Sequence, residues 1–114
     1  MGNDVYGIDA SDSAKKHLKD KLFKVDLQSD IYPFEDNTFD IVFSKSVVEH
    51  LQEPDHMLKE AYRVLKKGGV IITMTPSWKH SYKYQFYIDH THVTPFIKYS
   101  LKTIHELEGF KNID

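Results

Sequence analysis

The amino-acid sequence predicts an α/β fold, a mostly parallel sheet with flanking helices. Short β-branched, apolar runs alternate with amphipathic stretches along the chain, which is the pattern of strands joined by helices. The run at residues 70–75 is apolar on both faces and stops at Pro76, as expected of a parallel strand covered by helices on both sides. A well-marked helix at residues 55–67 precedes it. In such a fold the ligand site lies at the carboxyl ends of the strands.

Strands and one helix are expected in the first half of the chain. Ser11 can cap the helix, in which Ala14, Leu18 and Leu22 recur at a spacing of four residues. A stretch rich in turn residues, 32–38, separates the second and third strands. The strands expected here lie at residues 5–8, 23–27 and 39–43.

The helix at residues 55–67 has clear signals at both ends. Pro54 suits the first turn of a helix, and Gly68 suits the position just beyond its last turn. Its apolar face is predicted to consist of Leu58, Ala61, Tyr62 and Leu65. The later elements expected are a loop or cap at residues 77–96, a helix at 96–108 and a final strand at 110–113.

Length and composition exclude several classes of protein. The 114 residues suffice for one domain, residues 1–114, and not for two. The net charge of −2 provides no basic surface for nucleic acid, and no apolar run is long enough to span a membrane. The chain has no cysteine, and polar residues follow Met1, so the default location is the cytoplasm.

Five blocks of sequence, in order, resemble the class I S-adenosylmethionine-dependent methyltransferases. The blocks are residues 5–9 (VYGID) with Ser11, 25–27 (VDL), 33–44 (PFEDNTFDIVFS), 48–51 (VEHL) and 63–69 (RVLKKGG). Residues 92–96 and 108–110 are also similar to later segments of the family. The resemblance implies a Rossmann-like sheet, S-adenosylmethionine as the cofactor and a small molecule as the methyl acceptor.

The resemblance also assigns roles to residues at strand ends. Asp9, with Ala10 beside it, would accept hydrogen bonds from the ribose hydroxyls of the cofactor. Asp26 would accept from the adenine amine while the backbone of Leu27 meets the ring, and Ser44 would lie near the methionine part. Each residue also has a plain structural interpretation: Asp9 as an acid at a helix start, Asp26 as a loop aspartate and Ser44 as a serine at a strand end.

His50 is the candidate catalytic residue. By resemblance Glu49 and His50 approach the acceptor pocket, where a neutral imidazole could take the proton of the attacking atom. The alternative is a polar helix or loop residue without a catalytic role. Asp89, His90 and His92 lie together in the sequence, but their spacing fits no zinc pattern, so no metal is expected. The aromatic residues between Tyr82 and Tyr99 either line an acceptor pocket or pack the cap.

One family feature is missing from these residues. The family begins with a strand and a glycine-rich turn that lets the backbone approach the cofactor, and none of the five glycines here can form that turn. The domain is therefore expected to be incomplete, without its first strand and helix and with a shortened terminal hairpin. The absent strand would leave two strand edges unpaired, so a homo-oligomer or a swapped dimer is predicted to cover them.

Three functional hypotheses follow. The first is S-adenosylmethionine-dependent methyl transfer to a small molecule, with this chain a truncated copy by ancestry. The second is a non-catalytic binding or interaction domain derived from a methyltransferase. The third, a metal-dependent hydrolase that uses Glu49, His50, His90 and His92, is disfavoured.

Overall fold

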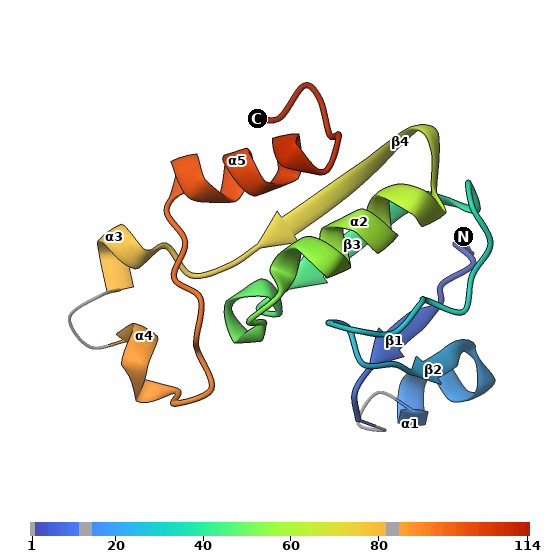
Figure 1. Ribbon diagram of the computed structural model, residues 1–114. Coiled ribbons are helices and arrows are strands. Elements are labelled where there is room, and N and C mark those ends of the chain that lie inside the picture. Colours follow the sequence, from blue (N-terminus) through green and yellow to red (C-terminus); the bar gives the residue numbers. More distant parts are fainter. Residues whose placement is uncertain (1, 12–14, 82–84) are drawn as a thin grey trace.

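The computed structural model describes residues 2–11, 15–81 and 85–114 (Figure 1). The strands are β1 (Gly7–Asp9), β2 (Leu22–Lys24), β3 (Phe39–Lys45) and β4 (Leu65–Met74). The helices are α1 (Lys15–Leu18), α2 (Pro54–Val64), α3 (Trp78–Ser81), α4 (Gln85–Ile88) and α5 (Lys98–Leu107), with 3-10 turns η1 (Lys19–Lys21) and η2 (Val48–His50). In the ranges described, no helix combines the length and the apolar character needed to cross a bilayer.

The strands pair in parallel, as the sequence predicts. β1 pairs with β2, placing Asp9 opposite Lys24, and β3 pairs with β4, placing Phe43 opposite Ile72. The two pairs form separate two-stranded sheets, because within the described residues no strand joins β1 to β3. Leu22 is the first residue of β2, so its prediction as part of a helical face is wrong. Ala14, predicted on the same face, lies outside the described residues.

Helix α2 forms where predicted but ends three residues early, at Val64. Its last carbonyls accept from loop backbone, since the amides of Asn37 and Thr38 donate to Arg63 (3.0 Å) and Val64 (2.7 Å). The chain then enters β4 directly, with Gly68 at a φ of +80°, a conformation that glycine adopts without strain. The buried face is Met57, Leu58, Ala61 and Val64, whereas Tyr62, predicted on that face, is exposed.

The final strand predicted at residues 110–113 does not form. The amide of Phe110 donates to the carbonyl of His105 (3.1 Å), which turns the chain back onto the end of α5. The ring of Phe110 then packs edge-on against Tyr62, with ring centroids 5.2 Å apart. These contacts take the backbone away from the sheet, so the segment has no strand partner.

The described residues of the segment predicted as a loop or cap, 77–81 and 85–96, include two short helices, α3 and α4. A parallel bridge between Ser77 and Phe96 closes the base of this segment. Phe86 is buried and meets the ring of Trp78 edge-on at 5.4 Å. Phe86 is therefore packed, whereas Tyr87 and Tyr99 are exposed, so the choice between cap packing and an acceptor pocket stays open for the described aromatic residues.

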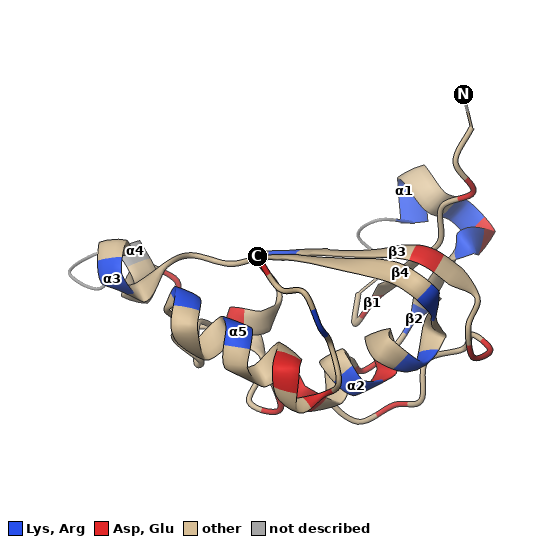
Figure 2. Ribbon diagram, turned by 90° about the horizontal axis from the view of Figure 1, so that it is seen from above, with Lys and Arg blue, Asp and Glu red and all other residues tan. Residues whose placement is uncertain are grey.

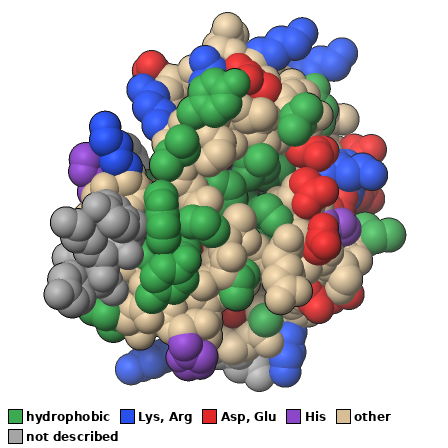
Figure 3. Space-filling view, turned by 60° about the vertical axis from the view of Figure 1, so that its left-hand side comes forward, with side chains coloured by type: hydrophobic (Ala, Val, Ile, Leu, Met, Phe, Trp, Pro, Cys, Tyr) green, Lys and Arg blue, Asp and Glu red, His purple; other side chains and the backbone are tan. Residues whose placement is uncertain are grey.

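Helices α2 and α5 lie on the same side of β3 and β4 (Figure 2). The prediction that β4 is covered on both faces is therefore wrong for the described residues, because no described helix packs on its other face. Five apolar side chains of these strands stay exposed: Ile41, Phe43, Val70, Ile72 and Met74. Elsewhere, too, apolar side chains gather at the surface, as in the middle of the face in Figure 3. The homo-oligomer or swapped dimer stays a prediction.

Candidate functional site

Asp9 lies at the carboxyl end of β1, at the expected strand end. Its Oδ1 accepts from the backbone amide of Ser11 (2.9 Å) and from the Ser11 hydroxyl (3.2 Å). The carboxylate thus holds the turn after the strand, and the neighbouring Ala10 is exposed. These contacts give Asp9 a role in the turn after β1. Its interpretation as an acid at a helix start and its assignment to the ribose both stay predictions.

Asp26 follows β2, the strand next to β1. Its Oδ1 accepts from the amide of Gln28 (2.9 Å), and its own amide donates to Asp30 (2.8 Å), so the exposed carboxylate shapes its own turn. Leu27 packs against the core, and its carbonyl accepts from the Tyr32 hydroxyl at 3.0 Å. Because β1 and β2 run in parallel, the turns that carry Asp9 and Asp26 follow the same end of this strand pair.

Ser44 lies near the carboxyl end of β3 and is only 8% exposed. Its hydroxyl has no hydrogen-bond partner, which is uncommon for a buried polar atom. Two residues later Ser46 adopts a left-handed backbone with a φ of +54°, and the chain leaves the strand. A buried hydroxyl without a partner at a strand end is consistent with a polar ligand group that binds beside it.

These strand-end residues fit part of a nucleoside cofactor. Carboxylates after two adjacent strands and a buried hydroxyl after a third offer acceptors and a donor for hydroxyl and amino groups. The glycines do not supply a backbone cradle, since Gly7 lies within β1 and a Cβ there would lie 2.4 Å from Leu18. Gly68 and Gly69 lie within β4. Asp9, Asp26 and Ser44 therefore suit the hydroxyl and amino groups of such a cofactor, whereas these glycines provide no backbone contact for it.

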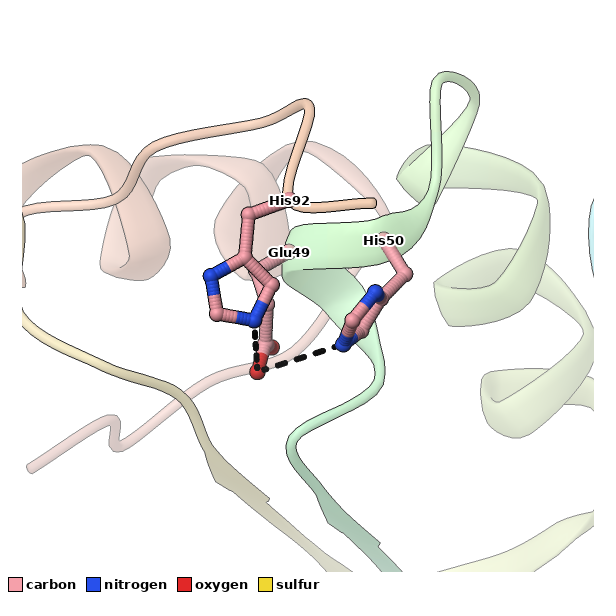
Figure 4. A group of neighbouring side chains, drawn as sticks. All are labelled: Glu49, His50 and His92. Carbon is pink, nitrogen blue, oxygen red and sulfur yellow. Dashed lines mark ion pairs between the residues drawn. The ribbon is translucent and has the colours of Figure 1, made fainter. Parts of the chain in front are cut away.

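The candidate catalytic residue, His50, lies in a cluster with Glu49 and His92 (Figure 4). Glu49 and His50 belong to η2, which follows β3, and His92 lies between α4 and α5. The Nε2 atoms of His50 and His92 lie 4.0 Å and 3.9 Å from Oε1 of Glu49. All three candidate ligand atoms lie within 4.8 Å of one another. Figure 4 shows both imidazoles turned toward the same carboxylate oxygen.

Backbone contacts explain why His92 lies beside η2. The amides of Val93 and Thr94 donate to the carbonyl of Glu49 at 2.8 Å and 3.0 Å. The hydroxyl of Thr94 also donates to the carbonyl of Leu51. The segment that carries His92 is thus fixed to the turn that carries the other two residues.

The sequence groups the acidic and histidine residues differently from the structure. It places Asp89, His90 and His92 together, but His90 is exposed and lies outside the cluster, and Asp89 is only a neighbour, with Oδ2 at 3.7 Å from His92 Nε2. The hydrogen bonds from Thr91 lower the pKa of Asp89. No spacing in the sequence signals that Glu49 and His92, 43 residues apart, come together.

A cavity of about 930 Å³ lies elsewhere, between β4, α5 and the C-terminal segment. Thr73 and His105 line it and share a hydrogen bond of 2.8 Å, and burial lowers the pKa of His105. None of the predicted site residues lines this cavity. The candidate site is therefore defined by strand ends and the Glu49 cluster.

Comparison with known proteins identifies the family. Residues 1–73 match the family described as a methyltransferase domain. A ubiquinone/menaquinone biosynthesis C-methyltransferase of Rhizobium rhizogenes is 36% identical over 74 residues, which are 65% of this chain and 29% of that protein. Phosphoethanolamine N-methyltransferase 2 of Caenorhabditis elegans is 37% identical over 83 residues, covering 65% of this chain and 19% of that protein.

Solved structures agree with this family. An S-adenosylmethionine-dependent methyltransferase from Archaeoglobus fulgidus superposes with a TM-score of 0.78 and 28% identity, covering 94% of this chain and 51% of that one. The chain therefore spans about half of that solved structure and less than a third of the two curated relatives. Its strand pairs and flanking helices are a portion of the Rossmann-like fold, and the cofactor of the family is S-adenosylmethionine. The chain belongs to the class I S-adenosylmethionine-dependent methyltransferases.

Proposed function

We propose that this chain contributes to S-adenosylmethionine-dependent methyl transfer to a small-molecule acceptor. The observation that supports the proposal most is the set of polar groups near the carboxyl ends of strands: Asp9 and Asp26 at the parallel pair β1 and β2, and Ser44 near the end of β3. In open α/β sheets ligands bind at this edge. The cofactor supplies a methyl group on a positively charged sulfur atom.

The chain's residues have distinct roles in this proposal. The carboxylate of Asp9, next to Ala10, accepts from the ribose hydroxyls. Asp26 accepts from the adenine amine, and the backbone of Leu27 contacts the ring. The buried hydroxyl of Ser44, which lacks a partner in the structure, hydrogen-bonds the methionine part.

His50 is proposed to accept the proton that the acceptor loses. Its Nδ1 lies 2.7 Å from the Thr91 hydroxyl, which fixes the orientation of the ring. Its side chain is 31% exposed, so an acceptor can approach it from solvent. The unprotonated nitrogen of a neutral imidazole has a lone pair that can take the proton.

A small acceptor fits the charge of the chain better than a nucleic acid does. A net charge of −2 gives no long-range attraction for a polyanion. The names of the curated relatives refer to ubiquinone/menaquinone biosynthesis and to phosphoethanolamine. We therefore propose an organic acceptor of small size.

The test is a chimera that adds a strand and a glycine-rich turn, of the kind that the family resemblance implies, ahead of residue 1 of this chain. In that chimera Asp9→Ala is expected to weaken S-adenosylhomocysteine binding by about 1.5–3 kcal/mol, the range for hydrogen bonds to a charged group. Asp9→Asn should recover part of the loss, because an amide keeps one acceptor oxygen. Calorimetric titration measures both variants.

The matched control is Asp20→Ala, which removes an exposed acid from η1. It should leave the affinity unchanged. If Asp9→Ala binds as tightly as the parent chimera, Asp9 only stabilises its turn and the ribose assignment is wrong.

The alternative function is a non-catalytic binding or interaction domain derived from a methyltransferase, favoured by Gly7, Gly68 and Gly69, which lie within strands and form no backbone cradle for the cofactor. The unmodified chain is then expected to bind S-adenosylmethionine weakly or not at all, because several backbone hydrogen bonds of about 1 kcal/mol each are missing. Titration of the unmodified chain checks this. Micromolar affinity would contradict the expectation of weak binding and favour the catalytic proposal.

A further inference from the structure

Glu49 is a fully buried carboxylate with one unsatisfied oxygen. Its Oε2 accepts from the Thr75 hydroxyl at 2.8 Å, while Oε1 has no hydrogen-bond partner although the side chain is 0% exposed. A charged oxygen buried in this way is costly unless a cation or a donor meets it. Oε1 is also the atom toward which His50 and His92 point (Figure 4).

The hydrogen bonds of His92 determine which of its nitrogens carries the proton. Its Nδ1 lies 2.7 Å from the carbonyl of Phe86, which can only accept, so Nδ1 carries the proton. In the neutral ring, Nε2 then carries a lone pair. That lone pair is directed toward the cluster, 3.9 Å from Oε1 of Glu49.

His50 also carries its proton on Nδ1, because of its contact with Thr91. The Thr91 hydroxyl donates to Oδ1 of Asp89, a carboxylate that can only accept, so its oxygen is left to accept from Nδ1 of His50 at 2.7 Å. The Nε2 atom of His50 then carries the lone pair. A chain of carboxylate, hydroxyl and imidazole therefore orients this ring, like the outer hydrogen bonds that orient histidines bound to metal ions.

We propose that Glu49, His50 and His92 form a binding site for one divalent metal ion of the zinc type. Two imidazole lone pairs and one carboxylate oxygen converge on a single point, and two neutral imidazoles with one carboxylate are a ligand set that zinc uses. The evidence for this site does not depend on the proposed methyl transfer, since it comes only from the contacts of these three residues and their partners, although both proposals use Nε2 of His50.

The distances are close to those that zinc needs. Zinc binds nitrogen and carboxylate oxygen at about 2.0–2.2 Å, so ligand atoms of a tetrahedral site lie about 3.4 Å apart. The separations of 3.9 Å and 4.0 Å require each imidazole to move about 0.5 Å closer to Oε1 of Glu49. The ligand atoms of the two imidazoles, which lie within 4.8 Å of each other, must also approach, and side-chain rotation provides such shifts. Three protein ligands leave a fourth position for water or an oxygen ligand. This position lies on the solvent-facing side of His50, whose side chain is 31% exposed.

The proton acceptor role of His50 and its role as a ligand use the same nitrogen. In the metal-bound chain Nε2 of His50 is occupied and does not accept a proton, whereas the metal-free chain keeps it available. Binding of the metal alone therefore tests the site without any measurement of methyl transfer.

The experiment is a titration of the purified chain with Zn²⁺ against a chromogenic chelator, repeated with Co²⁺ to record its visible absorption. The chain should bind one ion, and the Co²⁺ spectrum should show the bands of a four-coordinate site. Glu49→Gln and His92→Gln should each lower the affinity more than the ten- to hundredfold typical of losing an outer hydrogen-bond partner. Thr91→Val, which keeps all three ligands, should lower it about 10- to 100-fold.

The matched control is His90→Gln, an exposed histidine two residues from His92 that lies outside the cluster. It should bind Zn²⁺ as the parent chain does, and circular dichroism of every variant checks that it folds. The proposal is overturned if the parent chain binds no stoichiometric ion, if Glu49→Gln binds as tightly as the parent, or if His90→Gln loses as much affinity as His92→Gln.

Discussion

Two buried glutamates, Glu60 and Glu49, have opposite surroundings. Glu60, in the middle of α2, is 7% exposed and both of its oxygens have donors: Oε1 accepts from the Tyr32 amide (2.7 Å) and Oε2 from Nε of Arg63 (2.7 Å). Glu49, in η2, is 0% exposed and has one oxygen without a donor. The two side chains are buried to a similar degree, but only the Glu60 carboxylate has a hydrogen-bond donor at each of its oxygens.

The difference separates a structural carboxylate from a functional one. Arg63 joins Glu60 to the carbonyls of Phe34 (2.8 Å) and Tyr32 (3.1 Å), so this pair fixes the loop before β3 onto α2. Glu49 joins only Thr75 through its side chain, and its second oxygen faces two histidines. A protein tolerates an unsatisfied buried charge mainly where a ligand or a reaction uses it.

The largest effect is expected from Arg63→Met, which leaves the Glu60 carboxylate buried without its cation. Breaking a fully buried pair in this way costs about 3–5 kcal/mol of unfolding free energy, and because the Arg63 side chain is 26% exposed we expect a loss at the lower end, about 3 kcal/mol. Urea denaturation measures the loss. The double variant Glu60→Gln with Arg63→Met should recover part of the lost stability. If the double variant loses as much stability as Arg63→Met alone, packing of the Arg63 stem and not its charge is responsible.

A smaller effect of opposite sign is expected from Glu49→Gln in the metal-free chain. The amide keeps an acceptor for Thr75 and removes the unpaired charge, so the free energy of unfolding should rise by about 1–3 kcal/mol, the cost of an unmade buried hydrogen bond. Denaturation in the presence of a chelator measures it. A destabilisation similar to that of Arg63→Met would mean that Glu49 is a structural carboxylate like Glu60.

The smallest effect concerns pH. The hydrogen bond from Arg63 lowers the pKa of Glu60, so the ionised form is favoured in the folded chain. Its contribution to stability is fully present above the ordinary value of 4.5 and is lost as the pH falls through the lowered folded pKa. In that acid range the free energy of unfolding of Arg63→Met should fall less steeply with decreasing pH than that of the parent chain. Asp20→Ala should show the same pH dependence as the parent chain.

The sequence predicted the elements that local signals specify. Pro54 and the apolar spacing of Leu58 and Ala61 located α2, and the β-branched run at residues 70–73 located β4. The ends of elements were predicted less well, because tertiary contacts determine them. Val64 ends α2 because its carbonyl accepts from Thr38, and Phe110 leaves the strand pattern because it packs on Tyr62.

The candidate site could be predicted only in part. The strand-end positions of Asp9, Asp26 and Ser44 follow from the strand pattern, and the family blocks drew attention to His50. The third, disfavoured hypothesis already combined Glu49, His50 and His92 with His90, but no sequence signal separates the members from His90. The proximity of the first three depends on a connection from α4 to α5 that brings residue 92 back to residue 49. The roles of the strand-end residues stay predictions.

The five exposed apolar side chains on β3 and β4 also affect how the chain responds to temperature and salt. Apolar surface in contact with water has a large heat capacity, so any association that covers Ile41, Phe43 and Ile72 should show a negative heat-capacity change. Such an association weakens on cooling and strengthens in sulfate, which is excluded from protein surfaces. The solubility of the isolated chain should therefore be highest in the cold and at low concentrations of sulfate.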